Sequence, residues 1–332
     1  MNALDRRIFA AYNSFDSTPL PDLLIQLLEN QKRTWPMAAE GYSSLQYVQI
    51  RELKCNSSTG AAYPAWLQFN PKRITSTGAK VDADSISRRR CFLCIDNLPP
   101  EQQGVLYERD FIALCNPMPI FSAHYTISHV QHQPQIIEPN LEIFLRLARD
   151  LSPRFTVFYN GAKCGASAPD HFHFQAVPAG KIPIEQEAIK DSRREHMQSR
   201  NGIAILLLKD LGRAVIVLEG KQAESIATIL RQQLMKMKAI LDTSEEPMVN
   251  IICHYHEPQW RVIVFPRRRH RPEVFFKTGA DKILISPAAV DMGGLIITPI
   301  EKDFQKVDAR MIEQIYREVS WEEESVRSLL LS

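Results

Sequence analysis

The residues best suited to chemistry are two histidines and a glutamine that alternate along the chain, His171, His173 and Gln175. Side chains alternate between the two faces of an extended strand, so these three share one face while Phe172 and Phe174 share the other. We expect the polar set to face a cleft and the aromatic pair to face a core. A neutral imidazole can attack phosphorus near pH 7, because its ordinary pKa leaves an unprotonated nitrogen available. The pattern therefore predicts transfer chemistry at phosphorus, with His173 as the nucleophile.

The segment before these residues, 159–167, is rich in glycine and other small residues. Such a segment suits a tight loop whose backbone N–H groups approach a phosphate closely, with Ser167 as an extra donor. Gln175 can hold a phosphate oxygen as charge accumulates in the transition state, without adding a negative charge beside an anionic substrate. The alternative is a half-buried strand with two hydrogen-bonded histidines, and the loop makes that alternative less favoured.

A second group of residues has the composition of a metal site. Cys91 and Cys94 form a Cys-x-x-Cys pair, which supplies two thiolate ligands from one turn, and a tetrahedral zinc site needs two more. His132 and His171 are the best candidates, and His129 is a competing ligand. Zinc held in this way would fix the end of the motif strand and orient the nucleophile two residues on, which is a structural role. The alternative is that the two cysteines are ordinary thiols and His132 is a surface residue.

Length and composition indicate an ordinary globular protein. The chain has 332 residues, 45% of them hydrophobic, which is enough for one large domain or two smaller ones. Its 40 basic and 38 acidic residues give a net charge of +2, so nucleic acid and acidic membrane surfaces are not expected partners. The sequence has no apolar run near the roughly 20 residues of a membrane span, no signal-peptide pattern and no disulfide-scaffold pattern among its six cysteines. These features predict a cytoplasmic protein.

The order of expected elements indicates a duplication. The first half is predicted to contain strands at 111–115, 124–128, 155–159 and 170–177, with a helix at 141–151. The second half repeats this order, with strands at 203–208, 214–218, 249–254 and 260–265 and a helix at 223–241. Strands that meander around one crossover helix favour an α+β fold with a mainly antiparallel sheet and flanking helices.

The second copy lacks the reactive residues. Placing Pro178 over Pro266 sets Gln259, Arg261 and Ile263 opposite His171, His173 and Gln175. One active centre is therefore expected for each pair of repeats. We predict a helical extension at 1–60, a catalytic repeat at 61–200, and a degenerate second repeat with a C-terminal cover at 201–332.

Two basic stretches have open interpretations. Residues 70–78 are expected to form a donor-rich loop, in which Lys72 and Arg73 either contact a phosphate or remain solvated. The run from Arg267 to Arg271 is either a solvated strand exit or a phosphate-binding edge. The remaining expected elements are helices at 20–28 and 308–326 and strands at 65–69 and 282–286.

The motifs resemble a known family. The pairs and runs Asn160-Gly161, Gly165-Ala166-Ser167 and His171 to Gln175 are similar to the signature of the transferase branch of the histidine-triad superfamily, in which glutamine replaces the third histidine. That branch includes galactose-1-phosphate uridylyltransferase, diadenosine tetraphosphate phosphorylase and the nucleoside-diphosphate-hexose phosphorylases. His124 resembles the histidine that opens the superfamily's second strand, and Cys91, Cys94, His132 and His171 match the zinc ligands of the uridylyltransferases. Phe172 departs from the proline or basic residue often found there, whereas Phe174 matches the hexose phosphorylases.

The resemblance implies tandem histidine-triad-like repeats and a phosphorylase-type nucleotidyltransferase. His173 would attack the α-phosphorus of a nucleoside diphosphate sugar, and the nucleotidyl-histidine so formed would pass its nucleotide to phosphate or a sugar phosphate. The implied catalytic residues are His173, Gln175 and Ser167, and the implied substrate-binding residues are Asn160, Gly165, Ala166, Arg73 and Lys72. Zinc would be structural, and relatives in this branch often dimerise.

Two other functions remain open from the sequence. A dinucleoside polyphosphate phosphorylase, or a hydrolase with water as the acceptor, would use the same intermediate. A zinc-stabilised nucleotide-binding protein without turnover belongs to a different class. The intact His173 and Gln175 argue against the binding protein, because binding alone requires neither residue.

Overall fold

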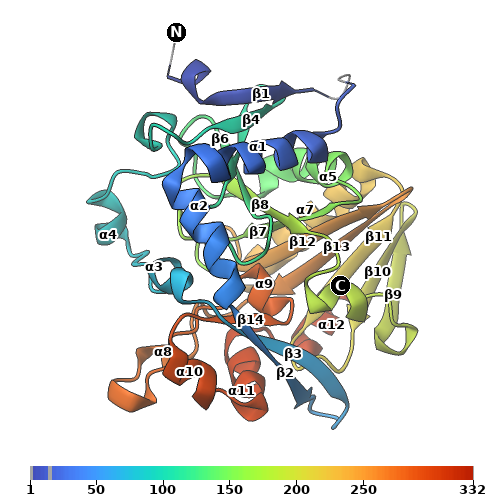
Figure 1. Cartoon of the computed structure of the whole chain (residues 1–332). Coiled ribbons are helices and arrows are strands. Elements are labelled where there is room, and N and C mark those ends of the chain that lie inside the picture. The colour runs from blue at the N-terminus through green and yellow to red at the C-terminus, as the bar shows by residue number, and fades with distance from the viewer. Residues whose placement is uncertain (1–2, 14–16, 332) are drawn as a thin grey trace.

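The computed structural model describes residues 3–13 and 17–331, and its centre is one large sheet (Figure 1). In this part of the chain, eleven strands cross the sheet in the order β1-β4-β5-β6-β8-β7-β12-β13-β11-β10-β9. Their bounds are β1 Ile8–Tyr12, β4 Gly104–Tyr107, β5 Phe111–Cys115, β6 Tyr125–His129, β7 Phe155–Asn160, β8 His173–Pro178, β9 Arg194–Arg200, β10 Ile203–Leu208, β11 Val215–Gly220, β12 Val249–His256 and β13 Gln259–Pro266. All neighbouring strands are antiparallel except β1 and β4. The predicted α+β class with a mainly antiparallel sheet is confirmed.

Helices cover one face of the large sheet. They are α1 Leu20–Thr34, α2 Pro36–Ser43, α5 Leu141–Asp150, α7 Ala223–Ile240 and α12 Glu323–Leu331. Their apolar residues form one core with the sheet, and this core contains Phe172 and Phe174, whose ring centroids are 4.9 Å apart. Phe144 of α5 stacks on Phe174 with 5.1 Å between centroids. The aromatic side of the motif therefore faces a core, as predicted.

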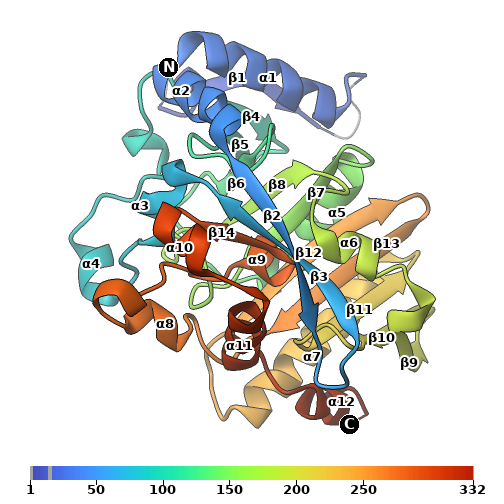
Figure 2. The same ribbon diagram turned by 60° about the horizontal axis from the view of Figure 1, so that its bottom comes forward.

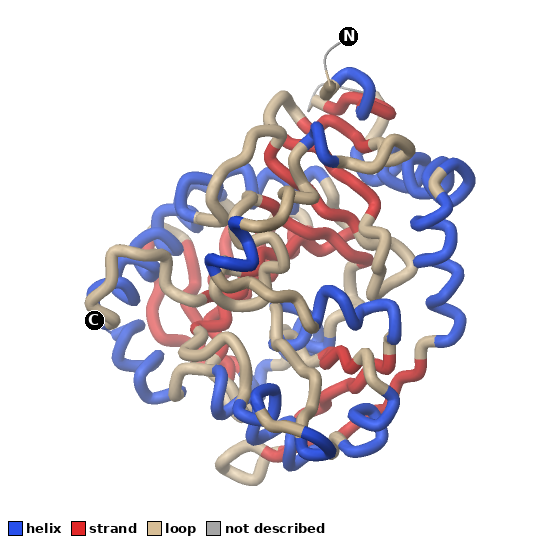
Figure 3. Tube along the Cα trace, turned by 90° about the vertical axis from the view of Figure 1, so that its left-hand side faces the viewer, coloured by secondary structure: helices blue, strands red, loops and turns tan. Residues whose placement is uncertain are grey.

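A smaller sheet lies across the other face (Figure 2). Its strands are β14 Leu295–Thr298, β3 Ala62–Phe69 and β2 Gln49–Asn56, and the helices α9 Ala289–Met292, α10 Glu301–Lys306 and α11 Ala309–Val319 accompany them. The core of this layer includes Val177 of β8 and Phe158 of β7. Because side chains alternate along β8, His173 and Gln175 lie on the same face as Val177. Viewed from the side, strands occupy the middle of the molecule and helices the periphery (Figure 3).

The large sheet has the same strand order in each half. From the middle outward, β7-β8-β6-β5 runs one way and β12-β13-β11-β10 runs the other. Phe158 pairs with Ile252 where the halves meet, and these two residues pair in turn with Gln175 and Ile263. The register thus relates Gln175 to Ile263 by the same symmetry as the alignment of Pro178 with Pro266.

The remaining helices are short segments that link these layers. They are α3 Ile74–Thr77, α4 Ala83–Ser87, α6 Pro183–Glu187 and α8 Glu273–Phe276. None of the helices in the described ranges is long and apolar enough to cross a membrane.

Three predicted elements are wrong near the site. The motif strand begins at His173 and not at 170, because the N–H of Phe172 donates to the carbonyl of Gln133 in a loop instead of continuing the ladder. Residues 70–78 are not a plain loop, since a helical turn and α3 occupy 71–77. The helical extension at 1–60 also contributes strands, with β1 in the large sheet and β2 in the small one.

Two predicted elements near the C-terminus are also wrong. Residues 282–286 form no strand, because the N–H groups of Ile283 and Leu284 donate to the carbonyl of Val274 and the carboxylate of Asp303. The helix expected at 308–326 is divided into α11 and α12. The break lies where Ser320 pairs with Arg267 and extends the backbone.

Candidate active site and metal cluster

The predicted nucleophile has one ring nitrogen occupied and one available. His173 is 3% exposed, and its Nδ1 lies 2.8 Å from the carbonyl oxygen of His171. A carbonyl can only accept, so Nδ1 carries the proton and Nε2 keeps its lone pair. Burial lowers the pKa of His173 to about 4, which leaves the ring neutral at pH 7. A buried neutral imidazole with a free Nε2 is the form required of a nitrogen nucleophile.

His124 orients the glutamine of the motif. The Nε2 atom of His124 lies 2.8 Å from Oε1 of Gln175, and its Nδ1 accepts from the backbone N–H of Ile120 at 3.3 Å. This pairing makes Nε2–H the donor to the amide oxygen, so the amide nitrogen of Gln175 is left as a donor for a ligand. Burial, followed by the charge of Arg73, lowers the pKa of His124 to about 3. The resemblance matched His124 to a family position but did not predict this orienting contact.

Arg73 is a basic residue whose charge acts on His124. Its Nη1 donates to the carbonyl of Met118 at 2.8 Å, and its Nε is buried with no hydrogen-bond partner in the described chain. Burial lowers the pKa of Arg73 to about 10, against the opposing effect of Asp291, so the guanidinium stays charged. An incompletely paired, half-buried cation near His124 suits an anionic ligand.

The four predicted metal ligands lie together. The donor atoms of Cys91, Cys94, His132 and His171 are all within 4.8 Å of one another. Nδ1 of His171 is 3.3 Å from Sγ of Cys91 and 3.6 Å from Sγ of Cys94, and Nδ1 of His132 is 3.2 Å from Sγ of Cys94. Two thiolates and two imidazoles at these spacings match a tetrahedral ion, so the cluster can bind a metal.

Neighbouring groups hold the histidines of this cluster. Nε2 of His171 donates to the carbonyl of His129 at 2.7 Å, which leaves Nδ1 free to coordinate. Asp170 lies 3.9 Å from Nε2 of His132 and accepts from Nη2 of Arg89 at 2.6 Å. These contacts fix the ring orientations that a closed site requires.

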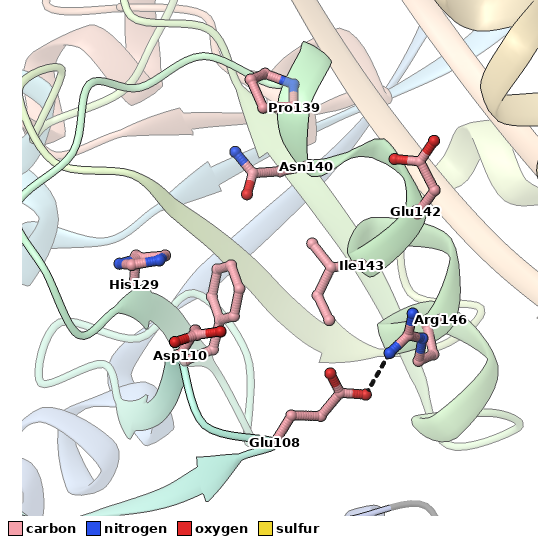
Figure 4. A pocket seen from close by; sticks show the side chains of 9 residues that line it. Glu108, Asp110, His129, Pro139, Asn140, Glu142, Ile143 and Arg146 are labelled. Carbon is pink, nitrogen blue, oxygen red and sulfur yellow. Dashed lines mark hydrogen bonds and ion pairs between the residues drawn. The ribbon is translucent and has the colours of Figure 1, made fainter.

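The ring of His129, the competing candidate ligand, lies outside the metal cluster. Its Nδ1 accepts from the N–H of Gln131 at 3.0 Å, and its ring lines a pocket beside α5 with Asp110, Asn140 and Glu142 (Figure 4). Three carboxylates line this pocket, those of Glu108, Asp110 and Glu142, and Glu108 is paired with Arg146. His129 therefore contributes its carbonyl to the cluster and not its ring.

The small-residue loop contacts residues of the second half of the chain. Oδ1 of Asn160 accepts from Nδ2 of Asn250 at 2.9 Å and from the N–H of Ala289 at 2.7 Å, so this oxygen is already used within the protein. Gly165 has a φ of +108°, and a Cβ there would lie 2.5 Å from the Cβ of Ala288. Ala166 is buried, whereas Ser167 is half-buried and has no hydrogen-bond partner in the described chain.

Two basic residues have partners within the protein. Lys72 is exposed and forms an ion pair with Glu40 of α2. Arg267 is 0% exposed, which overturns both the solvated exit and the phosphate-binding edge for this residue. Its guanidinium donates hydrogen bonds to the side chain of Asn250 and to the carbonyls of Pro287 and Val319. Charge alone did not reveal this role, because the accepting carbonyls are distant in sequence.

Comparisons with known proteins agree with this fold. Residues 27–178 match a domain of unknown function, DUF4922, and residues 187–329 match a GDPGP1-like C-terminal domain. The crystal structure of yeast Ap4A phosphorylase Apa2 superimposes with a TM-score of 0.60 at 15% identity, covering 90% of this chain and 97% of that one. The chain has the fold of this yeast phosphorylase.

The complex of the same yeast enzyme with Ap4A is also similar in fold. It gives a TM-score of 0.56 at 15% identity, again covering 90% of this chain and 97% of the yeast chain. No curated protein sequence matches the chain. The predicted resemblance is thus confirmed at the level of fold, through the similarity to the yeast phosphorylase.

The first prediction concerns the metal cluster. Purified protein should hold about one zinc per chain, and Cys91→Ser should lower this content strongly, because serine is a poor zinc ligand. Cys253→Ala is the matched control, since Cys253 is buried in β12 outside the cluster. Elemental analysis after dialysis measures both. Zinc content that is unchanged in Cys91→Ser would reject the site.

The second prediction concerns the close approach at Gly165. Both Gly165→Ala and Gly180→Ala place a side chain at positive φ, at a cost on the order of 1–3 kcal/mol. A Cβ at Gly180 meets nothing within 4 Å, whereas one at Gly165 overlaps Ala288. We expect Gly165→Ala to lower the free energy of unfolding more, as measured by urea denaturation. Equal losses would contradict a tight contact between the loop and the second half.

Proposed function

We propose that the protein is a phosphorylase-type nucleotidyltransferase that uses His173 as a covalent nucleophile. Its substrate would be a nucleoside diphosphate sugar, and its acceptor would be phosphate or a sugar phosphate. One observation carries the proposal: the Nδ1–H of His173 is committed to the carbonyl of His171, so Nε2 keeps its lone pair and is available to attack.

The reaction would proceed by two displacements. The lone pair of Nε2 attacks the α-phosphorus, the bond from that phosphorus to the bridging oxygen breaks, and the sugar phosphate leaves. The hydrogen bond from Nδ1–H to His171 stabilises the positive charge on the ring of the adduct. An oxygen of the acceptor phosphate then attacks, the N–P bond breaks, and a nucleoside diphosphate is released with His173 restored.

Other residues would stabilise the charge that develops on the phosphate. The amide nitrogen of Gln175, turned outward by His124, donates to a non-bridging oxygen. Arg73 supplies a nearby positive charge, and the half-buried hydroxyl of Ser167 is a further donor. Asn160, Gly165 and Ala166 would shape the loop around the phosphate. Among the predicted substrate-binding residues Lys72 has the least support, because it is paired with Glu40.

The metal cluster would be structural. Cys91, Cys94, His132 and His171 would hold zinc, which would supply four bonds that fix the loop before β8. The ring of His171 faces the cluster through Nδ1 while its carbonyl faces His173. The cluster would therefore act on the chemistry through position only.

Dinucleoside polyphosphates are a second candidate class of substrate. The observation that favours them is the similarity of fold to the yeast Ap4A phosphorylase along nearly the whole of that chain. The GDPGP1-like match of the C-terminal part is a separate likeness and does not decide between the two classes. Both classes present an α-phosphorus to the same nucleophile, so one assay can compare them.

The third prediction is a covalent adduct on His173. Incubation with α-labelled nucleoside diphosphate sugars and dinucleoside polyphosphates should leave label on the protein that is lost in acid and kept in base. His173→Ala should abolish the label and lower kcat by at least about 10⁴-fold. The control is His196→Ala, which alters an exposed histidine of β9. Undiminished label in His173→Ala would refute the covalent mechanism, and label from one class only would identify the substrate.

The fourth prediction separates Gln175 from the nucleophile. Gln175→Ala removes one donor to the developing charge and should lower kcat by about 10²- to 10³-fold with a smaller change in KM. Label should still form on His173, but slowly, as measured by rapid quenching. A rise in KM alone would show that Gln175 only binds substrate.

A further inference from the structure

We propose that Gln135 is the positioning residue for the nucleophile and that Glu246, from the second half of the chain, anchors it. The inference rests on the proposed function of His173 but concerns residues that the sequence motif does not contain. Gln135 lies in the loop after His132, is 1% exposed, and uses both ends of its side-chain amide at the catalytic strand.

The side chain of Gln135 substitutes for missing strand partners. Its Oε1 accepts from the backbone N–H of His173 at 2.7 Å, and its Nε2 donates to the carbonyl of His173 at 2.9 Å. The same Nε2 donates to the carbonyl of Asn160 at 2.9 Å. One amide thus ties the first residue of β8 to the last residue of β7, where the two strands no longer pair with each other.

These contacts set the direction of the reactive side chain. Because both backbone polar groups of His173 are held, its backbone dihedral angles are fixed, and the Cα–Cβ bond is fixed with them. The ring is held separately by its contact with the carbonyl of His171. A shift of about 1 Å in a reacting group can cost about 10²-fold in rate. Gln135 is therefore placed to control kcat without touching substrate.

Glu246 holds the backbone that carries Gln135. Its Oε1 accepts from the hydroxyl of Tyr159 at 2.6 Å, and its Oε2 accepts from the N–H of Ile137 at 2.6 Å. The hydroxyl of Tyr159 also lies 3.0 Å from the carbonyl of Gln135. Glu246 precedes β12, so this chain of contacts links the second half to the nucleophile of the first.

The test compares a near-isosteric change with a matched one in the same loop. Gln135→Met keeps the length of the side chain but removes all three hydrogen bonds, whereas Gln131→Met alters an exposed glutamine four residues earlier. We expect Gln135→Met to lower kcat by about 10- to 100-fold with KM changed less than threefold, and Gln131→Met to match the wild type. Tyr159→Phe should lower kcat by a smaller factor, because it removes one of the two contacts of Glu246 and leaves the side-chain hydrogen bonds of Gln135 to β7 and β8 in place.

A readout independent of turnover keeps this proposal separate from the proposed function. Hydrogen–deuterium exchange at the N–H of His173, followed in fragments of the intact protein, should be faster in Gln135→Met and unchanged in Gln131→Met. If the wild type labels no histidine, the proposed function fails, while the exchange result still tests the positioning. Wild-type kcat and exchange in Gln135→Met would overturn the inference. If Gln135→Met does not fold, kcat and exchange at the His173 N–H are measured in Tyr159→Phe instead. Wild-type values of both in that variant would also overturn the inference.

Discussion

The hydrogen bond from Nδ1 of His173 to the carbonyl oxygen of His171 is the interaction on which the site depends. An imidazole free to rotate could present either nitrogen, and only this contact assigns the proton to Nδ1 and the lone pair to Nε2. The carbonyl stays in place because the ring of the same residue is held by the carbonyl of His129 and lies against the two thiols of the cluster. His171 therefore joins the cysteine and histidine cluster to the proposed nucleophile, through its ring on one side and its carbonyl on the other.

The same sheet register that places these groups shows how the second half differs. In the positions related by symmetry to His173 and Ser128 stand Arg261 and Glu219, which pair across β11 and β13. Burial raises the pKa of Glu219, but hydrogen bonds from Arg194 and Arg261 outweigh it and lower that pKa overall. The carboxylate is thus charged and shared between two guanidinium groups, so these side chains are already paired with one another. A symmetric backbone carries the proposed nucleophile His173 in one half and an ion-pair network in the other.

Local pattern was enough to predict the strands β5 to β8 around the motif and its aromatic face, because apolar runs and alternation are properties of neighbouring residues. Residue chemistry, and then the resemblance, grouped Cys91, Cys94, His132 and His171, which the structure brings together. The predicted alternation of side chains does not extend to His171, because it requires a continuous strand. The backbone there turns instead toward the loop after β6. Arg267 and Gln135 could not be assigned from composition, because their partners are carbonyl groups, and every residue type has a carbonyl.

The second half supports the reactive half at two independent points. Asn250 donates to the side chain of Asn160 and to the carbonyl of Cys164, and the buried cation of Arg267 holds the oxygen of Asn250 in turn. Glu246 supports the opposite side of the same loop through Tyr159. A loop rich in glycine has large conformational entropy when free, so its geometry must be imposed by contacts from outside it. The second half supplies these contacts, which gives a physical reason for a half without the proposed nucleophile to be part of the candidate site.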